Sequence, residues 1–383
     1  MDIGYFRFVE DNLKTRTLNA MAHQFYGLNL IVFGPEDINY DQNTVRGMYL
    51  TSIGWKRTEV PLPKIINNMP HRSNSKSEVY EYLNNNSLLL FNHFGNKDYV
   101  ENLLKENNIL QDLIIPSKTP TSPEDLLNMI DTHEKLLFKP TDSNMGRGIF
   151  IVEKSGDIYE YKGQDEKYTI DKSRICDIYD DIKNRYIIQK YIKSLTPKGL
   201  PFDIRVQYEK SGNGKWKIVQ RYARVAISND IVSNVAKGGS VIRAGLFLRS
   251  IYGEEKGREL SKILNEKLKS FPKKFERLYN FNISTIAIDL GLHNDEFYLF
   301  EVNSFPGGTF ARGEIAILRA AYAKHLAERL PDANRTIVTY EDLLNEIDTL
   351  KKENKLQKQQ LNSVLKSKSW RYTSIFRKKQ ERI

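Results

Sequence analysis

Residues 286–308, IAIDLGLHNDEFYLFEVNSFPGG, carry the strongest indication of the fold. Two apolar runs flank a short polar segment, and this pattern predicts a β-hairpin. Side chains alternate between the two faces of a strand, so Glu301 and Asn303 point to the same face. A three-residue turn at Asn294–Glu296 would place Asp289 directly opposite Glu301. The stretch therefore predicts two carboxylates and an amide that face one another.

The surroundings of these polar residues indicate what they bind. Carboxylates that face one another between apolar strands are costly unless positive charge lies between them. Mg²⁺ binds carboxylate and amide oxygens together with nucleotide phosphates. We therefore expect Asp289, Glu301 and Asn303 to be magnesium ligands. The alternative is a solvated strand face on which the acids share no ligand.

A glycine-rich stretch, KPTDSNMGRGIF at residues 139–150, is the second feature. It is not a Walker A motif, because Lys139 precedes the glycines and the chain contains no GxxxxGK[ST] sequence. A dinucleotide-binding fingerprint is also excluded, since a strand-like segment follows the loop. We expect a hairpin loop, or flap, whose backbone N–H groups close over phosphates. An ordinary glycine-rich turn is the alternative.

The composition limits the class of protein. The chain has 383 residues, of which 40% are hydrophobic and 28% charged, as in globular proteins of two or three domains. No apolar stretch is long enough for a transmembrane helix, and the N-terminus lacks the regions of a secretory signal. Cys176 is the single cysteine, so intramolecular disulfides are excluded and a cytoplasmic location is expected. The histidines show no metal-ligand spacing, and no Ser-His-Asp arrangement is discernible.

The net charge of +10 is concentrated at the C-terminus. Residues 366–383 hold seven basic residues against Glu381, which gives 7 − 1 = +6. We therefore expect no nucleic-acid partner for the body of the protein, although binding through the tail alone would be steeply salt-dependent. Aromatic residues such as Trp370 lie among the basic ones, which suits a peripheral contact with an anionic membrane surface at its inner face. A solvated, disordered tail is the alternative.

Strand and helix patterns predict an α+β fold that follows an N-terminal α/β domain. The helix expected at residues 96–110 has Asn96 as its N-cap and Tyr99 among its apolar positions, and a helix of about eighteen residues is expected from Glu255. The predicted strands are Leu136–Lys139, Gly148–Glu153, Tyr186–Tyr191, Phe202–Glu209, Trp216–Ile227, Thr285–Leu290 and Phe297–Val302. The predicted units are residues 1–95, 96–328 with a flap subdomain at about 115–190, 338–366 as a helix, and 367–383 as the tail.

Residues 340–364 follow the 4-3 spacing of a coiled coil. Asn354 occupies an a position, and opposite charges such as Glu353 and Lys358 fall at g and the following e positions. This pattern predicts a parallel homodimer. Because Gln357 interrupts the apolar seam, a lone surface helix is the alternative.

A lysine before a glycine-rich flap, followed far downstream by a D…E-x-N-x-x-P-G hairpin, resembles the ATP-grasp superfamily. The stretches GPEDINYDQNTVRGMYL, PLPKIINNMPHR and NKDYVENLL look like its YheC/YheD-type members, some of which are spore-coat associated. The resemblance covers about residues 1–325 and implies two α+β subdomains that clasp ATP. The tail, SKSWRYTSIFRKK, is similar to the C-terminal segments of surface-polysaccharide glycosyltransferases.

The resemblance implies roles for individual residues. Lys97 and Lys139 would bind phosphates, Gln189 the adenine edge, and the backbone near Tyr191 the rest of the base. Two Mg²⁺ ions would be held by Asp289, Glu301 and Asn303, with Glu301 bridging them. The residues implied in nucleotide binding are Lys97, Lys139, Ser143, Gly146, Gly148, Gln189, Lys190, Tyr191, Ile192 and Phe300, and those near the substrate end are Asn234, Gly238 and Gly239.

The activity that the resemblance implies is ADP-forming ligation of a carboxylate to an amine through an acyl phosphate. Arg205 and Arg224, with Lys139, would stabilise the transferring phosphoryl group, and Asp203 is expected to orient Arg205. The tail likeness suggests a uronic acid or surface polysaccharide as the carboxylate and an amino acid or other amine as its partner. The alternative is a catalytically idle ATP-binding module with a structural or coat-associated role.

Overall fold

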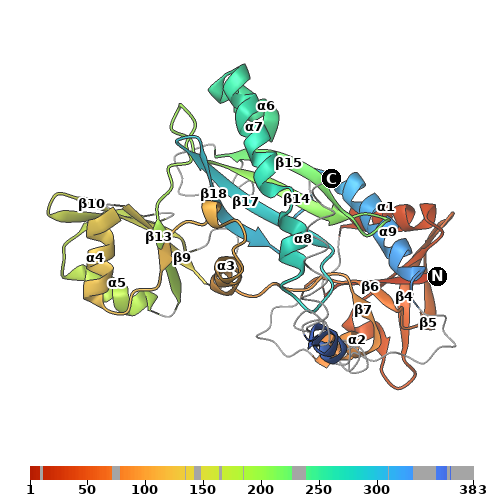
Figure 1. Cartoon of the computed structure of the whole chain (residues 1–383). Helices are drawn as coiled ribbons and strands as arrows, with labels where there is room; N and C mark the ends of the chain where they lie inside the picture. Colours follow the sequence, from red (N-terminus) through yellow and green to blue (C-terminus); the bar gives the residue numbers. More distant parts are fainter. Residues whose placement is uncertain are drawn as a thin grey trace, which may run out of the picture.

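Three β-sheets, each with helices packed on it, make up the described part of the chain (Figure 1). The computed structural model describes residues 1–8, 12–70, 78–133, 135–141, 148–163, 166–183, 185–226, 239–308, 310–330, 351–359 and 363. The α+β fold that the sequence predicts is confirmed.

The N-terminal sheet is mixed, in the strand order β3-β4-β2-β1-β6-β7 with β5 beside β4. Strands β2, β1, β6 and β7 run parallel, as expected for an α/β domain, and their short apolar runs form its core. The elements are β1 Asp2–Phe6, α1 Leu13–Phe25, β2 Asn29–Phe33, β3 Ile38–Asn39, β4 Thr44–Thr51, β5 Gly54–Pro61, β6 Ile65–Asn67, α2 Glu78–Asn86 and β7 Leu88–Leu89, with a 3₁₀ turn at Pro35–Asp37.

The second sheet, which we call the flap sheet, is antiparallel in the order β12-β11-β10-β9-β13-β8. Helices α4 and α5 cover one of its faces (Figure 1), and their apolar residues, such as Ile130 and Ile175, pack on Phe138 and Val152. The hairpin predicted around the glycine-rich loop is confirmed, because Phe138 of β9 pairs with Phe150 of β10. The elements are β8 Ser117–Lys118, α4 Pro123–His133, β9 Lys135–Pro140, β10 Phe150–Ser155, β11 Ile158–Lys162, β12 Lys167–Ile170, α5 Arg174–Ile182 and β13 Tyr186–Lys190.

The third sheet, which we call the central sheet, has the antiparallel order β16-β15-β14-β17-β18. Helices α6 and α7 form a hairpin at one end of it (Figure 1), and a Cβ at Gly257 would lie 2.5 Å from the backbone of Arg249, so only glycine allows this close approach. The elements are β14 Phe202–Lys210, β15 Trp216–Val225, β16 Ser240–Arg243, α6 Ala244–Tyr252, α7 Glu254–Leu268, α8 Phe271–Glu276, β17 Thr285–His293 and β18 Glu296–Asn303.

Two helix predictions are corrected in detail. Helix α3, Lys97–Glu106, begins after Asn96 as expected, with a 3₁₀ turn at Gln111–Leu113 beyond it, but Val100 and Leu104 are its buried residues and Tyr99 is 51% exposed. Helix α7 has 15 residues instead of about eighteen, since α8 starts separately with a proline in its first turn.

Most of the predicted coiled coil and the whole basic tail lie outside the described residues. Residues 351–359 are helical, and each of them is exposed. The homodimer expected through residues 340–364 therefore stays a prediction. No helix in the described part of the chain has both the length and the apolar character needed to cross a membrane.

Helix α9, Arg312–Ala327, packs against α1 through small side chains, among them Ala22, Ala316 and Ala320. Next to this contact, His23 is fully buried, and its Nδ1 lies 2.7 Å from the carbonyl oxygen of Asn19. Its Nε2 has no partner among the described residues. Burial lowers the pKa of His23 to about 4, so the folded protein keeps this ring neutral at neutral pH.

This buried imidazole predicts acid-sensitive stability. Because the pKa of His23 is about 4 in the folded chain and near 6.5 when unfolded, its contribution is complete above pH 6.5 and is lost as the pH falls toward 4. The loss reaches about 3 kcal/mol of the free energy of unfolding. Urea titrations between pH 7 and 4 should show a shallower pH dependence for His23→Gln than for the wild type. His133→Gln, at an exposed position, should follow the wild type, and parallel slopes for all three proteins would contradict the prediction.

Candidate functional site

The hairpin of β17 and β18 pairs Asp289 with Glu301, as the sequence predicts, but its turn is shorter than predicted and its ladder contains an irregularity. The turn has two residues, Asn294 and Asp295, both with the left-handed backbone of a tight hairpin turn. An irregularity in the ladder then leaves Phe300 as an extra residue in β18, which is a β-bulge. The bulge shifts the register by one residue and so restores the predicted pairing.

The apolar residues of the two strands explain the bulge. In β17 the core-facing residues all have even numbers, from Ile286 to Leu292. In β18 they switch from the odd positions Phe297 and Leu299 to the even position Val302. A regular strand keeps one parity on each face, so all these side chains reach the core only if one residue is extra between Leu299 and Val302.

The bulged residue joins two sheets. The carbonyl oxygen of Phe300 accepts a hydrogen bond of 3.1 Å from the Nζ of Lys139 on β9 of the flap sheet. Its ring lies against Gly291, where an added Cβ would be 2.2 Å from the ring. Glycine is therefore required at this position for the ring to lie there.

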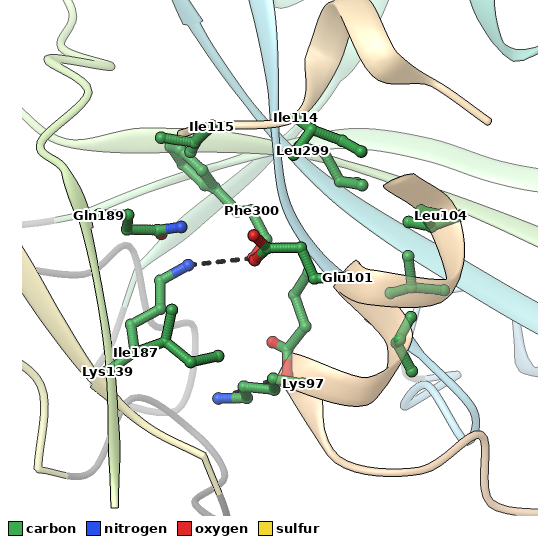
Figure 2. Close-up of a pocket in the computed structure, with 13 residues that line it drawn as sticks. Lys97, Glu101, Leu104, Ile114, Ile115, Lys139, Ile187, Gln189, Leu299 and Phe300 are labelled. Carbon is green, nitrogen blue, oxygen red and sulfur yellow. Dashed lines mark hydrogen bonds and ion pairs between the residues drawn. The ribbon is translucent and has the colours of Figure 1, made fainter. Parts of the chain in front are cut away.

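A pocket lies between the flap sheet, the central sheet and α3. Figure 2 shows Lys139, Ile187 and Gln189 on one side of it, facing Lys97 and Glu101 of α3 on the other. Its walls combine aliphatic side chains with a few charged and polar groups, as in many nucleotide sites. The lining residues are Lys97, Val100, Glu101, Leu104, Ile114, Ile115, Lys139, Ile187, Gln189, Leu299, Phe300, Glu301 and Val302.

Gln189 supplies the buried polar group of this pocket. Its side chain is 3% exposed, and its Oε1 accepts no hydrogen bond from the described residues. A buried acceptor without a donor costs roughly 1–3 kcal/mol, so a ligand N–H that reaches it would relieve this cost. An exocyclic amino group on a flat, largely apolar base meets this requirement.

The residues after Gln189 lie outside the pocket lining. The side chain of Lys190 is exposed, since successive residues of β13 point to opposite faces. The backbone N–H of Tyr191 donates to the carbonyl of Lys135, and the carbonyl of Ile192 accepts from the N–H of Ser194. The role in binding the base that the sequence gives to the backbone of this segment stays a prediction.

Two lysines supply positive charge at the pocket. The Nζ of Lys97, at the start of α3, lies 3.5 Å from the carboxylate of Glu301. Burial, together with the charge of Lys97, lowers the pKa of Lys139 to about 8, while the carboxylate of Glu301 opposes this shift. Two ammonium groups near one half-buried carboxylate favour an anionic ligand such as a polyphosphate.

Beyond the pocket, two arginines of the central sheet hold two aspartates. Arg205 makes a bidentate pair with Asp289, at 2.6 Å from Nε and 2.5 Å from Nη2. Arg224 pairs in the same way with Asp203, at 2.6 and 2.7 Å, and its Nη2 also lies 3.0 Å from Asp289. Such forked pairs are among the strongest side-chain interactions and fix both planes.

The expectation that Asp203 orients Arg205 is wrong. Asp203 lies directly across from Arg224 in the ladder of β14 and β15, whereas Arg205 lies directly across from Asp289 of β17. The Cβ atoms of directly opposed residues on neighbouring strands are closer than those of residues two apart on one strand. Each aspartate therefore forms its forked ion pair with the arginine opposite it. Asp203 therefore positions Arg224.

Burial alone would raise the pKa of Asp289, but Arg205 and Arg224 outweigh it and hold this pKa well below its ordinary value. The oxygens of Asp289 receive hydrogen bonds from Arg205 and from the amide of Asn303, at 3.2 Å for the latter. In contrast, the ion pair that Glu301 makes among the described residues is the longer one to Lys97, at 3.5 Å. The most available oxygens for a cation thus belong to Glu301 and Asn303.

The donor set fits Mg²⁺ when the amide oxygen is counted. Within the described ranges, no cluster of three His, Cys, Asp or Glu side chains forms a metal site. Asp289, Glu301 and Asn303 share the same face of the β17–β18 hairpin, so two carboxylates and an amide converge there. Asp289 would bind a cation only by exchanging one of its present hydrogen bonds.

Sequence reasoning missed Glu101 and the aliphatic walls of the pocket. Glu101 lies one helical turn after Lys97 on the same face of α3, and this i,i+4 spacing was the available signal. It pairs with Lys105 at 2.7 Å and accepts a hydrogen bond from Ser117. The walls, such as Ile114, come from a connection that has no periodic pattern.

Of the predicted residues in the flap and at the substrate end, the structure describes some and leaves out others. Ser143, Gly146, Asn234 and Gly238 lie outside the described residues, and Gly239 directly precedes β16. Gly148 has φ of +71° at the start of the strand that leaves the flap, a conformation that favours glycine.

The chain is similar to known proteins over most of its length. A sequence model described as YheC/D like ATP-grasp matches residues 72–330. The chain is 24% identical over 326 residues to the endospore coat-associated protein YheD of Bacillus subtilis (strain 168), which covers 79% of this chain and 71% of that protein. It is 20% identical over 303 residues to the endospore coat-associated protein YheC of the same strain, with 74% and 82% covered.

Among solved structures, the chain is similar to a RiPP-associated ATP-grasp ligase of Chryseobacterium gregarium in complex with ADP and a leader and core peptide. The TM-score is 0.51 at 12% identity, and the match covers 86% of this chain and 97% of that one. At this identity the likeness concerns the fold alone. The similarity of the tail to glycosyltransferase segments finds no support in these comparisons. Because the family match spans well over half of its length, the chain belongs to the YheC/D-like ATP-grasp family.

Proposed function

We propose that this protein is an ADP-forming ligase that joins a carboxylate to an amine. The observation that carries the proposal is one pocket that is lined by a buried lysine, Lys139, by Gln189 with its unpartnered buried Oε1, and by Glu301, the cross-strand partner of Asp289. Such a pocket offers a base-recognition end and a phosphate end in the order that a bound ATP requires. The fold family supports the same reading.

In the proposed reaction, Lys97 and Lys139 bind the phosphates, and Arg205 and Arg224 face the transferring phosphoryl group. Magnesium held by Glu301, Asn303 and Asp289 would neutralise phosphate charge. An oxygen of the acceptor carboxylate attacks the γ-phosphorus, and the bond from that phosphorus to the leaving oxygen of ADP breaks. The amine nitrogen then attacks the acyl carbon, phosphate leaves, and the nitrogen loses a proton.

The forked pairs of the central sheet explain why the arginines need no rearrangement. Asp203 and Asp289 fix both guanidinium planes before any ligand arrives, so the donors are already oriented. Preorganised donors act on the transition state without a cost of reorientation. Arg205 and Arg224 are buried for the most part, so water competes weakly for them.

A second candidate function is an ATP-binding module without turnover. Two observations favour it: two relatives are named as endospore coat-associated proteins, and Asp289 is already occupied by two arginines and Asn303. A sugar-acid acceptor, suggested by the tail likeness, has no support from the site itself. A turnover assay on an acceptor panel of uronic acids and peptides separates three cases: a ligase for sugar acids, a ligase for peptides, and a module that turns over neither.

Glu301→Ala tests the ligase. With hydroxylamine as a general amine, acyl phosphates are trapped as hydroxamates, and ADP release is measured across the acceptor panel. We expect the variant to lose about 100-fold or more of the ADP formation, because the cation that this carboxylate would help to hold would no longer neutralise the charge of the transferring phosphoryl group. ATP binding, measured by calorimetry, should weaken by less than about tenfold.

Glu296→Gln, at the exposed first position of β18 next to the turn, is the matched control and should keep wild-type turnover. ATP binding by the wild type without turnover on any acceptor would favour the idle module. Equal turnover by Glu301→Ala and the wild type would remove the proposed role of this carboxylate.

The pKa of Lys139 predicts the pH dependence of ATP binding. Since this pKa is about 8 in the free protein, the ammonium is charged below pH 8 and neutral above it. ATP affinity should therefore be constant at lower pH and fall by up to about tenfold for each pH unit above 8. Binding near pH 8.5 should also take up a fraction of a proton, which calorimetry in buffers of different ionisation enthalpy measures.

Lys139→Arg should bind ATP with a flatter pH profile, because a guanidinium stays charged throughout this range. Lys135→Arg, on the same strand, is the control and should retain the wild-type profile. An ATP affinity of the wild type that does not change between pH 7 and 10 would contradict the assignment of Lys139 to the phosphates.

A further inference from the structure

Five residues form one row across the central sheet. Arg243 of β16 lies directly across from Tyr222 of β15, and Tyr222 lies across from Arg205 of β14. Arg205 lies across from Asp289 of β17, and Asp289 from Glu301 of β18. Directly opposed residues project to the same face, so all five share the face that carries the candidate site.

The charges along this row are not evenly compensated. Arg205 is matched by Asp289, and its neighbour Arg224 by Asp203. Glu301 is matched by Lys97. Arg243, at the far end, is exposed, and its side chain makes no hydrogen bond or ion pair within the described part of the chain. The row thus ends in an uncompensated guanidinium.

The spacing of the row separates Arg243 from the phosphoryl site. Neighbouring strands lie about 4.8 Å apart, so three steps place the backbone of Arg243 roughly 14 Å from that of Asp289. Arg224 of β15 reaches Asp289 with its Nη2, so Arg243 of β16 occupies a position one strand beyond the arginines of the phosphoryl site. It suits a group several bonds away from the reacting carboxylate of an extended acceptor.

The floor between the two ends is aromatic. Tyr222 is buried, and the ring of Phe310 meets it edge-on with the centroids 5.4 Å apart. Phe310 is 52% exposed, so an apolar surface remains open beside the row. An acceptor with a short hydrocarbon linker would lie on this surface while its two ends meet arginines.

The geometry points to an acceptor with two anionic groups, of which one reacts near Arg205 and the other binds Arg243. The arginine fork binds a carboxylate or a phosphoryl group in the same bidentate manner, so the shared chemistry is a second oxyanion. A cationic group at this position would be repelled, which assigns the amine substrate to another approach. This inference rests on the proposed ligase function, since it concerns the carboxylate substrate of that reaction.

The test measures binding directly, so that it does not depend on turnover. The full chain, loaded with Mg²⁺ and ADP, is titrated calorimetrically with linear α,ω-dicarboxylates from succinate to suberate, each matched with the monocarboxylate of equal length. ω-Phosphono acids of the same lengths form a third arm. We expect the dianions of one length range to bind about tenfold or more tightly than the monoanions.

Arg243→Ala should remove this difference, and Arg243→Glu should shift the preference toward ω-amino carboxylates of the same length. Arg258→Ala, at an exposed site on α7, changes the net charge equally and should behave as the wild type. ADP binding in each sample shows that the nucleotide site is intact. The third arm decides whether the second group is a carboxylate or a phosphoryl group.

Equal affinity for monoanions and dianions, no binding of any dianion, or an unchanged preference in Arg243→Ala would each overturn the inference. These outcomes are separate from a failure of the ligase proposal. That proposal fails when no acceptor yields a hydroxamate in the turnover assay, whatever the binding titrations show.

Discussion

The bidentate pair of Arg205 and Asp289 is the interaction on which the site depends. Both side chains are largely buried in the middle of the central sheet, where removing either partner would leave an uncompensated charge at a cost of about 3–5 kcal/mol. The pair sets the direction of the Arg205 guanidinium, and Arg224 and Asn303 also contact the same carboxylate. The row of charged groups to which we assign the phosphate, the cation and the acceptor is thereby organised around one cross-strand contact.

The site also needs two sheets to meet. Lys139 comes from the flap sheet, yet its ammonium is held by the carbonyl of Phe300 in the central sheet. Gln189 and Ile187 of β13 and the helix α3 close the same pocket from other sides. Burial by these neighbours is the main cause that lowers the pKa of Lys139. The protonation of this lysine therefore depends on how the flap sheet, the central sheet and α3 pack together.

Much of this arrangement could be predicted from the sequence, and the limits have physical reasons. Strand alternation was enough to bring Asp289, Glu301 and Asn303 together, because side-chain direction is a local property. The partner of Asp203 depends on register between β14 and β15, which sequence spacing does not determine. Ile114 lines the pocket through tertiary contacts that no local pattern identifies, whereas the helical spacing of Glu101 from Lys97 was a usable signal. Lys190 faces outward because successive residues of β13 alternate between its two faces, and Gln189 faces inward.

The bulge at Phe300 also bears on how the hairpin reaches its native form. A ladder that continued regularly from the turn at Asn294 would set Phe300 beside Asp289 and direct Glu301 into the core. Such a misaligned hairpin buries a charge and exposes Val302, so it is rejected energetically at two places at once. The switch from odd to even core-facing positions in β18 therefore disfavours the misaligned hairpin during folding. Only the bulged alignment places the apolar side chains on both sides of Phe300 in the core.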